Sequence, residues 1–235
     1  MRILLFDIDG TLIDCGGTGR SAMDETLLTD FDIPELLVKV DLAGRTDRVI
    51  AHDYLARHDL PHDDASVERF LDGYLRRLRV NLPKRSGRVL PGVAPLLATL
   101  GPSCGDSVHL GLLTGNIVLG ARAKLDHYGL SHFFFTGANG AIPRGGFGDG
   151  ALDRNDIAAA AWRRLVKEFG PGVAPGDVWV IGDTPRDVRC ARSIGAHCLG
   201  VATGGASCEE LTLAGATATL ADCSDVAKAV EILLG

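Results

Sequence analysis

Two carboxylates close the first apolar segment of the chain. Residues 3–6 have the length and composition of a buried strand, and Asp7 and Asp9 follow it. Alternate residues of an extended chain point the same way, so these side chains share a face, and Gly10 indicates a sharp turn after them. Two such carboxylates raise each other's proton affinity unless a cation lies between them. The pattern therefore indicates a site for Mg²⁺, which prefers carboxylate and carbonyl oxygens.

Polar residues also close two later apolar segments. Thr114, Gly115 and Asn116 follow one of them, and Asp183 follows the other. In an open parallel sheet, ligands bind outside the carboxyl ends of the strands. Thr114 offers a hydroxyl, Gly115 lets backbone N–H groups approach a phosphate closely, and Asp183 adds a third carboxylate for the ion. We therefore expect these strand ends to form one site for a phosphate and a metal.

The stretch G-D-T-P-R-D at 182–187 carries a further acidic side chain. Asp187 lies one helical turn after Asp183, where it would hold a metal-bound water or orient Arg186. Taken alone, the stretch has an alternative interpretation as a helix start with Asp183 as the capping residue.

The rest of the chain alternates between strand and helix patterns. Such alternation predicts a parallel sheet with helices on both faces, so we expect an α/β fold with a doubly wound, Rossmann-like sheet. The glycine-rich stretch 137–150 is expected to be a mobile loop. The expected strands are 108–113, 133–136, 178–181, 197–201 and 217–220. The expected helices are 93–100, 117–128, 157–169, 187–194 and 225–234, with a further one that starts with a capping box at 207–210.

A helical segment interrupts this alternation after the first strand. Residues 13–20 contain three glycines and are expected to be a flexible exit, and the pattern that follows is helical to about residue 82. Ser66 is expected to cap a helix whose apolar positions recur every three and four residues. We expect a catalytic core of residues 1–14 and 84–235, and an all-helical cap of residues 15–83.

Composition restricts the classes of partner. The 235 residues carry a formal net charge of -6, which argues against nucleic acid or an anionic membrane as the main partner. A small phosphorylated metabolite remains compatible, because a bound Mg²⁺ and local cations invert the field inside a cleft. No apolar run has the length of a signal peptide or a membrane span, so we expect a cytoplasmic protein. The sequence gives no indication of oligomeric state.

The motifs at the three strand ends resemble those of the haloacid dehalogenase (HAD) superfamily, whose members are mostly Mg²⁺-dependent phosphohydrolases. The matching stretches are D-I-D-G-T-L at 7–12, T-G-N at 114–116 and G-D-T-P-R-D at 182–187. Their order and spacing extend the resemblance over nearly the whole chain. The helical segment is similar to the cap of the phosphoglycolate phosphatase-like branch.

The resemblance implies a role for each matching residue. Asp7 would be the nucleophile that forms an aspartyl-phosphate, and Asp9 would be the general acid and then the general base. Mg²⁺ would be held by Asp7, the backbone carbonyl of Asp9, and Asp183. The residues expected to bind the phosphoryl group are Gly10, Thr114, Gly115 and Asn116.

One element of the family pattern is missing. Members usually carry a phosphate-binding Lys in a K-P sequence before the helix that leads to the strand 178–181, but this region reads G-A-L-D-R-N-D-I. Arg154 lies near the expected place. Lys124 follows Asn116 by eight residues on a predicted helix, about 12 Å along its axis. We favour Lys124, because a compact ammonium suits a point contact, and keep Arg154 as the alternative.

The G-R-T-D stretch at 44–47 lies between two helical segments. Arg45 is the candidate for binding an anionic group of the substrate, and an ordinary solvated loop is the alternative.

These features favour a Mg²⁺-dependent phosphatase acting on a small phosphomonoester. A phosphomutase, which uses the same aspartyl-phosphate, is the main alternative. A non-catalytic protein that binds phosphorylated ligands is expected to lack Asp7 or Asp9, and both are present. Related dehalogenases do not need Asp9 or Asp183, and related phosphonate hydrolases carry a cap lysine where residues 15–23 have none.

Overall fold

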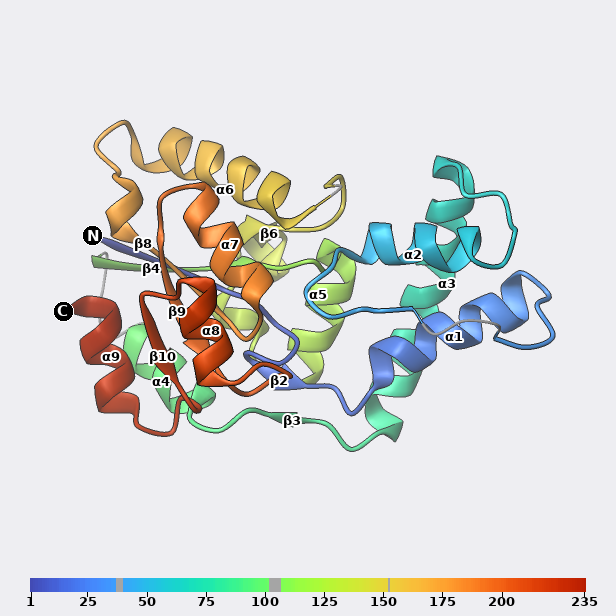
Figure 1. Ribbon diagram of the computed structural model, residues 1–235, viewed down its shortest axis with the longest axis horizontal. Coiled ribbons are helices and arrows are strands. Elements are labelled where there is room, and N and C mark those ends of the chain that lie inside the picture. The colour runs from blue at the N-terminus through green and yellow to red at the C-terminus, as the bar shows by residue number, and fades with distance from the viewer. Residues whose placement is uncertain (37–39, 102–106, 152) are drawn as a thin grey trace.

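A six-stranded parallel sheet runs through the larger part of the molecule (Figure 1). The computed structural model describes residues 1–36, 40–101, 107–151 and 153–235. The strand order is β10-β9-β8-β1-β4-β7, which places β1 between β8 and β4. The strands are β1 (Arg2–Phe6), β4 (Val108–Leu113), β7 (Gly145–Gly146), β8 (Val178–Gly182), β9 (His197–Val201) and β10 (Ala218–Leu220).

Helices cover both faces of the sheet, as a doubly wound α/β fold requires (Figure 1). Side chains alternate along β1: Leu4 and Phe6 pack with the helices of one face, and Ile3 and Leu5 with those of the other. The predicted fold class is confirmed. The first face carries α4 (Val93–Leu100), α5 (Val118–His127) and α9 (Val226–Leu234), and the second α6 (Arg154–Phe169), α7 (Pro185–Ser193) and α8 (Cys208–Ala214).

The register of the sheet brings three strand ends level with one another. Phe6, the last residue of β1, pairs with Leu112 of β4 and with Ile181 of β8. The N–H of Asp7 then donates to the Ile181 carbonyl at 2.9 Å. The residues that follow β1, β4 and β8 therefore meet at the same edge of the sheet.

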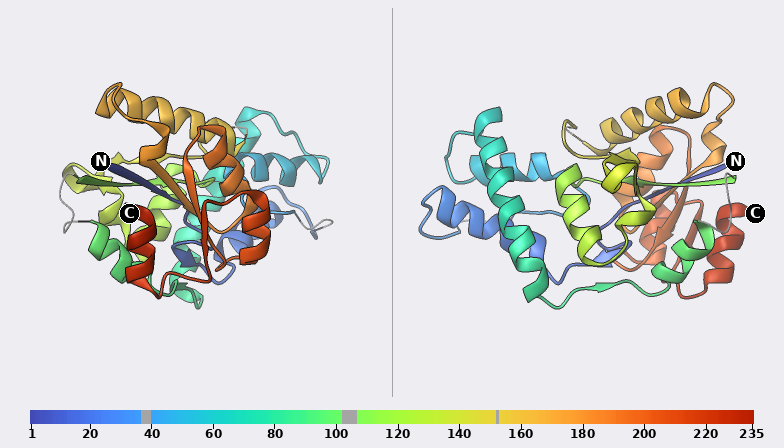
Figure 2. Two further views of the ribbon diagram at one scale, coloured as in Figure 1. Left: turned by 60° about the vertical axis from the view of Figure 1, so that its left-hand side comes forward. Right: turned by 180° about the vertical axis from the view of Figure 1, so that it is seen from behind.

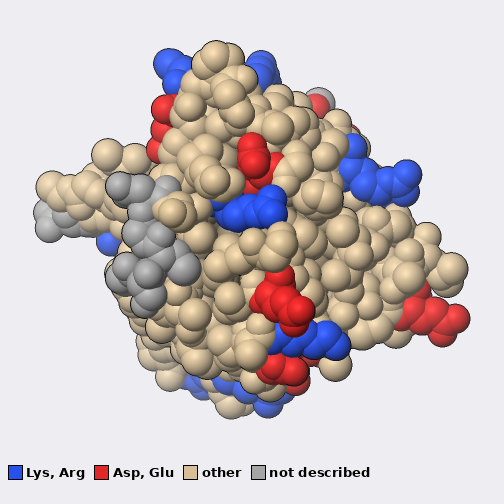
Figure 3. Space-filling model, turned by 90° about the vertical axis from the view of Figure 1, so that its left-hand side faces the viewer, with Lys and Arg blue, Asp and Glu red and all other residues tan. Residues whose placement is uncertain are grey.

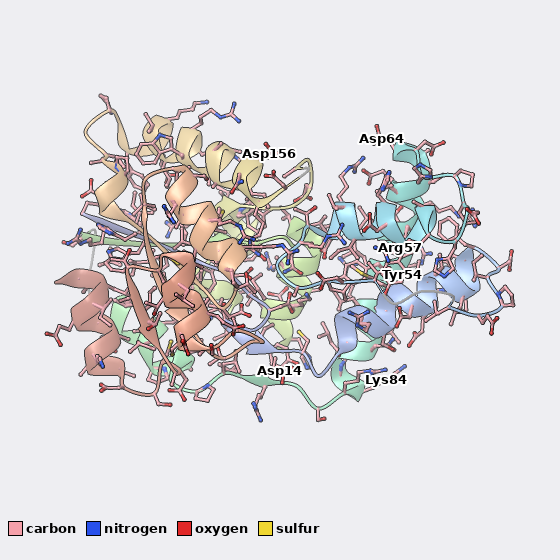
Figure 4. All side chains as sticks on the ribbon, viewed as in Figure 1. Asp14, Tyr54, Arg57, Asp64, Lys84 and Asp156 are labelled. Carbon is pink, nitrogen blue, oxygen red and sulfur yellow. The ribbon has the colours of Figure 1, made fainter. Side chains whose placement is uncertain are left out.

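Three helices form a separate group beside that edge (Figures 1 and 2). They are α1 (Thr18–Asp30), α2 (Asp47–Ala56) and α3 (Asp64–Asn81), and we call residues 18–81 the helical insert. Tyr54 of α2 lies close to α1 (Figure 4), where its hydroxyl donates to Asp24 Oδ1 at 2.5 Å. Seen from behind, α5 of the core stands beside α3 (Figure 2). The insert is joined to the core through β2 (Ile13–Asp14) and β3 (Arg88–Val89), which pair antiparallel.

Two expectations for irregular segments are wrong. Residues 137–150 contain β6 (Ile142–Pro143) and β7 rather than a loop alone, and β7 adds an edge strand beside β4. The predicted strand 133–136 forms β5 (Phe135–Thr136), which pairs antiparallel with β6 outside the main sheet. The expected flexible exit at 13–20 contains β2 and the start of α1. The strand β7 consists of two glycines and so has no alternation of apolar and polar side chains that a sequence pattern could detect. Only its backbone pairing with β4 identifies it as a strand.

The predicted helix cap at Ser66 is wrong, and the alternative of a cap at Asp183 is not found. The N-cap of α3 is Asp63, whose carboxylate accepts from the Ser66 N–H at 2.8 Å. The N-cap of α7 is Thr184, while the carboxylate of Asp183 lies next to Asp7 and Asp187. The capping box at Ser207 is confirmed. Short 3₁₀ helices complete the described chain at Leu82–Lys84, Ser131–Phe133, Ala138–Gly140 and Pro175–Asp177.

The surface shown in Figure 3, on the side of the chain ends, mixes Lys and Arg with Asp and Glu. Within the described ranges, no helix combines the length and the apolar character that a membrane crossing needs.

We predict that Gly145→Ala weakens the edge of the sheet. Gly145 has φ +116°, and a Cβ there would lie 1.9 Å from the Leu112 carbonyl oxygen. The variant is therefore expected to lower the free energy of unfolding by about 2 kcal/mol or more in urea titrations. Gly150→Ala is the matched control, because its Cβ would meet nothing within 4 Å. Equal unfolding free energies for the two variants would contradict the assignment of β7.

Candidate active site

Three buried carboxylates meet at the common strand edge. Asp7 follows β1, Asp183 follows β8, and Asp187 lies in the first turn of α7. One oxygen of each lies within 4.8 Å of the others. Burial raises the pKa of Asp7 to about 6 and that of Asp183 to about 8, and the neighbouring carboxylates add to both shifts. This donor set fits a hard divalent cation, which would stabilise the ionised carboxylates.

Arg154 is the cation of this cluster. Its side chain is 6% exposed, with Nη1 3.3 Å from Asp7 Oδ2 and Nη2 bonded to the Asp187 carboxylate. Nη2 also donates to the Leu113 carbonyl at 3.0 Å. The expectation that Asp187 orients Arg186 is therefore wrong: Asp187 holds Arg154, while Arg186 reaches the backbone carbonyl of Ala43, in the helical insert.

Asp9 lies in a different environment from Asp7. Its side chain is 45% exposed and accepts hydrogen bonds from Lys124 Nζ at 2.6 Å and Asn116 Nδ2 at 2.9 Å. Enclosure by the cavity walls would raise the pKa of Asp9, but the charge and hydrogen bond of Lys124 outweigh this and hold it below its ordinary value. Asn116 also bonds Lys124 and the Thr114 hydroxyl, at 2.7 and 2.9 Å. The residues after β1 and β4 therefore form one network.

The two candidate cations thus occupy different positions. Arg154 contacts Asp7, and Lys124 contacts Asp9. Neither replaces the other, because each compensates the charge of a different carboxylate.

The turn after the aspartates fits closely around Asp183. Gly10 has φ +84°, and a Cβ on it would lie 2.5 Å from Asp183 Oδ2. Thr11 donates its hydroxyl to Asp183 Oδ1 at 3.0 Å. Gly204, which follows β9, was not predicted from the sequence, yet a Cβ there would lie 1.7 Å from Asp183 Oδ2. Substituting either glycine would displace this carboxylate.

The backbone of the helical insert reaches the site at Arg45. A Cβ on Gly115 would lie 2.0 Å from the Arg45 carbonyl oxygen, so the two segments touch. The Arg45 guanidinium pairs with Asp53 at 2.8 Å and donates to the Asp41 carbonyl at 3.2 Å. Both terminal nitrogens of the guanidinium are therefore engaged within the insert, although Arg45 lines the cavity over the site.

A family model described as haloacid dehalogenase-like hydrolase matches residues 4–192, which includes the ends of β1, β4 and β8. The chain belongs to this family.

Individual relatives are similar over most of the chain. A phosphoglycolate phosphatase of Pseudomonas putida is 26% identical over 217 residues, which cover 86% of this chain and 70% of that protein. The probable phosphatase IndB of Dickeya dadantii is 26% identical over 243 residues, covering 99% and 94%. The structure of CbbY from Rhodobacter sphaeroides in complex with phosphate superposes with a TM-score of 0.72 at 18% identity over 96% of each chain. The predicted family and the prediction of a hydrolase are confirmed.

In this HAD-like hydrolase, a cavity of about 980 Å³ lies between the core and the insert, around the carboxylates. Met23, Ile50 and Tyr74 line it from the insert. The Tyr74 hydroxyl is buried and, among the described residues, has no hydrogen-bond partner. Burial raises the pKa of Tyr74, so the hydroxyl keeps its proton. Tyr74 was not predicted from the sequence, where its helical spacing indicated only a core position.

We predict that Mg²⁺ stabilises this hydrolase more at pH 8 than at pH 5. The pKa values of Asp7 and Asp183 are raised, so without metal these two groups bind more protons in the folded than in the unfolded chain, and their contribution to stability is lost as pH rises between about 4 and 8. Mg²⁺ at about 100 times its Kd adds about 2.7 kcal/mol, or roughly 5–10 °C in Tm at this chain length, in scanning calorimetry.

Asp183→Asn is the control for this prediction. It removes one ionised group from the cluster, so it is expected to raise metal-free stability at pH 8 and to abolish most of the Mg²⁺ effect. An equal Mg²⁺ effect in both proteins would contradict the assignment.

Proposed function

We propose that this hydrolase is a Mg²⁺-dependent phosphatase that cleaves a small phosphomonoester through an aspartyl-phosphate on Asp7. The observation that carries the proposal is that the two aspartates that follow β1 are paired with different cations in different surroundings. Arg154 faces Asp7 inside the buried cluster, and Lys124 faces Asp9 in the cavity. Carboxylates in unlike environments take unlike roles in acid and base chemistry.

In the first half of the reaction, an Asp7 oxygen attacks phosphorus and the bond to the ester oxygen breaks. Asp9 gives its proton to the leaving oxygen. In the second half, Asp9 takes a proton from a water that attacks the aspartyl-phosphate, the bond from phosphorus to Asp7 breaks, and phosphate leaves. Asp9 is then protonated again, so the cycle closes. The lowered pKa of Asp9 favours its carboxylate form, which serves the second half. For the first half, the anionic phosphomonoester would raise the proton affinity of Asp9 as it binds, so that Asp9 carries the proton that it gives.

The phosphoryl group is held by residues of both strand ends. The Thr114 hydroxyl and the Gly115 N–H would bind its oxygens, with Gly10 and Asn116 beside them. Asp7, the carbonyl of Asp9, and Asp183 would hold Mg²⁺, which supplies positive charge to the phosphoryl oxygens.

The helical insert would act as a cap, with residues 15–83 as the cap domain and 1–14 with 84–235 as the core. Contacts of Gly115 with Arg45, and of α3 with α5, support this role. A cap closed over the cavity excludes water while substrate binds and readmits it for hydrolysis.

The substrate would be a small phosphorylated metabolite of the cytoplasm. The phosphoglycolate phosphatase of P. putida supports a small anionic ester. The unpaired Tyr74 hydroxyl supports a leaving group with an oxygen of its own, because a buried donor is stabilised when an acceptor reaches it.

We predict that Asp7→Asn lowers kcat by about 10³-fold or more, because the amide is a poor nucleophile. Phosphate release is measured on a panel of small phosphomonoesters, including 2-phosphoglycolate and p-nitrophenyl phosphate, with Mg²⁺ and with EDTA. Asp72→Asn, at an exposed position of α3, is the matched control and is expected to retain wild-type turnover. Full phosphate release by Asp7→Asn, or transfer of the group to a second hydroxyl without release, would contradict the proposal.

We predict that Tyr74→Phe separates activity from stability. Removing the unpaired hydroxyl is expected to leave the urea midpoint unchanged or higher, since a buried unpaired donor costs about 1–3 kcal/mol. It is expected to lower kcat/KM about tenfold for esters whose leaving group carries an oxygen, and less than about twofold for phenyl phosphate. An equal loss for both kinds of ester would refute this role.

A further inference from the structure

Asp47 is a buried carboxylate that takes no part in the proposed chemistry. It is the first residue of α2, and its side chain belongs to the helical insert. Its Oδ2 accepts a hydrogen bond from the Ile117 N–H at 2.9 Å, and its own N–H donates to the Gly115 carbonyl at 2.8 Å. One residue of the insert therefore binds the core backbone on both sides of Asn116.

The start of α5 depends on these contacts because it has no cap of its own. Its N-cap is Ile117, which offers no side-chain acceptor. The first N–H groups of a helix lack partners within the helix, and negative charge nearby stabilises them. Here Asp47 accepts from Ile117, and Asp149 of the core accepts from the next residue, Val118, at 3.0 Å. Two neighbouring amides are thus capped by carboxylates from two different parts of the molecule.

Glycines allow this close approach. The Arg45 carbonyl lies 2.0 Å from where a Gly115 Cβ would be, and a Cβ on Gly148 would lie 2.1 Å from the Gly115 carbonyl oxygen. The Gly148 N–H also donates to the Asn116 carbonyl at 2.9 Å. The segment 114–116 therefore lies between the backbone of the insert and the backbone that follows β7.

We propose that Asp47 is a positioning residue, which holds the segment Thr114–Asn116 in its catalytic geometry when the helical insert is docked. The proposal rests on the proposed function, in which this segment binds the phosphoryl group. Asn116 transmits the effect, because its side chain bonds Thr114, Lys124 and Asp9. A shift of the backbone around Asn116 would disturb both the phosphoryl contacts and the Lys124–Asp9 pair. The site is then complete only with the insert in place.

The test compares variants of Asp47, which caps the Ile117 amide, with a variant of Asp149, which caps the neighbouring Val118 amide. Asp47→Ala is expected to lower kcat about 10–100-fold with a change of less than about threefold in KM, because positioning acts mainly in the transition state. Asp47→Asn keeps an acceptor oxygen and is expected to stay within about threefold of wild type. Asp149→Ala removes the cap of Val118 from the core side and is expected to change kcat less than about twofold. If Asp47→Ala is not recovered folded, Asp47→Gln, which displaces the acceptor by one methylene, is expected to show the same loss of kcat.

Hydrogen exchange supplies a measurement that does not depend on turnover. Asp47→Ala is expected to speed exchange at Asn116 and Ile117 and across α2, whereas Asp149→Ala is expected to speed it at Val118 alone. If the wild type releases no phosphate from any ester, the proposed function fails, while these exchange rates still decide whether Asp47 couples the insert to this segment. Wild-type kcat in Asp47→Ala or Asp47→Gln, no rescue by Asp47→Asn, or an equal loss in Asp149→Ala would overturn the proposal.

Discussion

Repulsion among buried carboxylates is the constraint on which the rest of the site depends. Asp7, Asp183 and Asp187 place oxygens within 4.8 Å of one another, where burial raises the pKa of Asp7 and of Asp183 and so disfavours the ionised forms of these two. Arg154 relieves part of this repulsion from the start of α6, and the remaining negative charge suits a divalent cation. The chain reaches Arg154 through β7, which pairs with β4, so a short glycine strand at the edge of the sheet helps to place the central cation.

The second ion pair separates two aspartates that are neighbours in sequence. Asp9 lies beyond the same strand as Asp7, but it turns to Lys124 and Asn116 rather than to the buried cluster. The two carboxylates therefore differ in exposure, in cation and in the direction of their pKa shifts. Such a difference is what a reaction needs when one carboxylate attacks and the other moves protons. The fold achieves it with a turn at Gly10 and with cations from two separate helices.

Sequence patterns predicted the features that depend on local chemistry. Apolar runs that end in polar residues located β1, β4 and β8, and their common edge followed from the rules of parallel sheets. Features that depend on contacts between residues far apart in the sequence could not be predicted from local patterns. The missing K-P lysine left Lys124 and Arg154 as alternatives, because only the folded chain shows that they face different aspartates. Asp47 is part of the same G-R-T-D stretch as Arg45, but nothing in the sequence indicates that its carboxylate accepts a hydrogen bond from the Ile117 N–H.

The most direct test of the account is to locate the phosphorylated residue. Enzyme that is turning over a substrate can be quenched in acid and reduced with borohydride, which converts an aspartyl-phosphate to homoserine, and then mapped by peptide mass spectrometry. We predict homoserine at position 7 and none at position 9, and we expect the homoserine at position 7 to disappear when Mg²⁺ is removed. Homoserine at position 9, or phosphate release with no reduced aspartate at all, would contradict the assignment of Asp7 as the nucleophile.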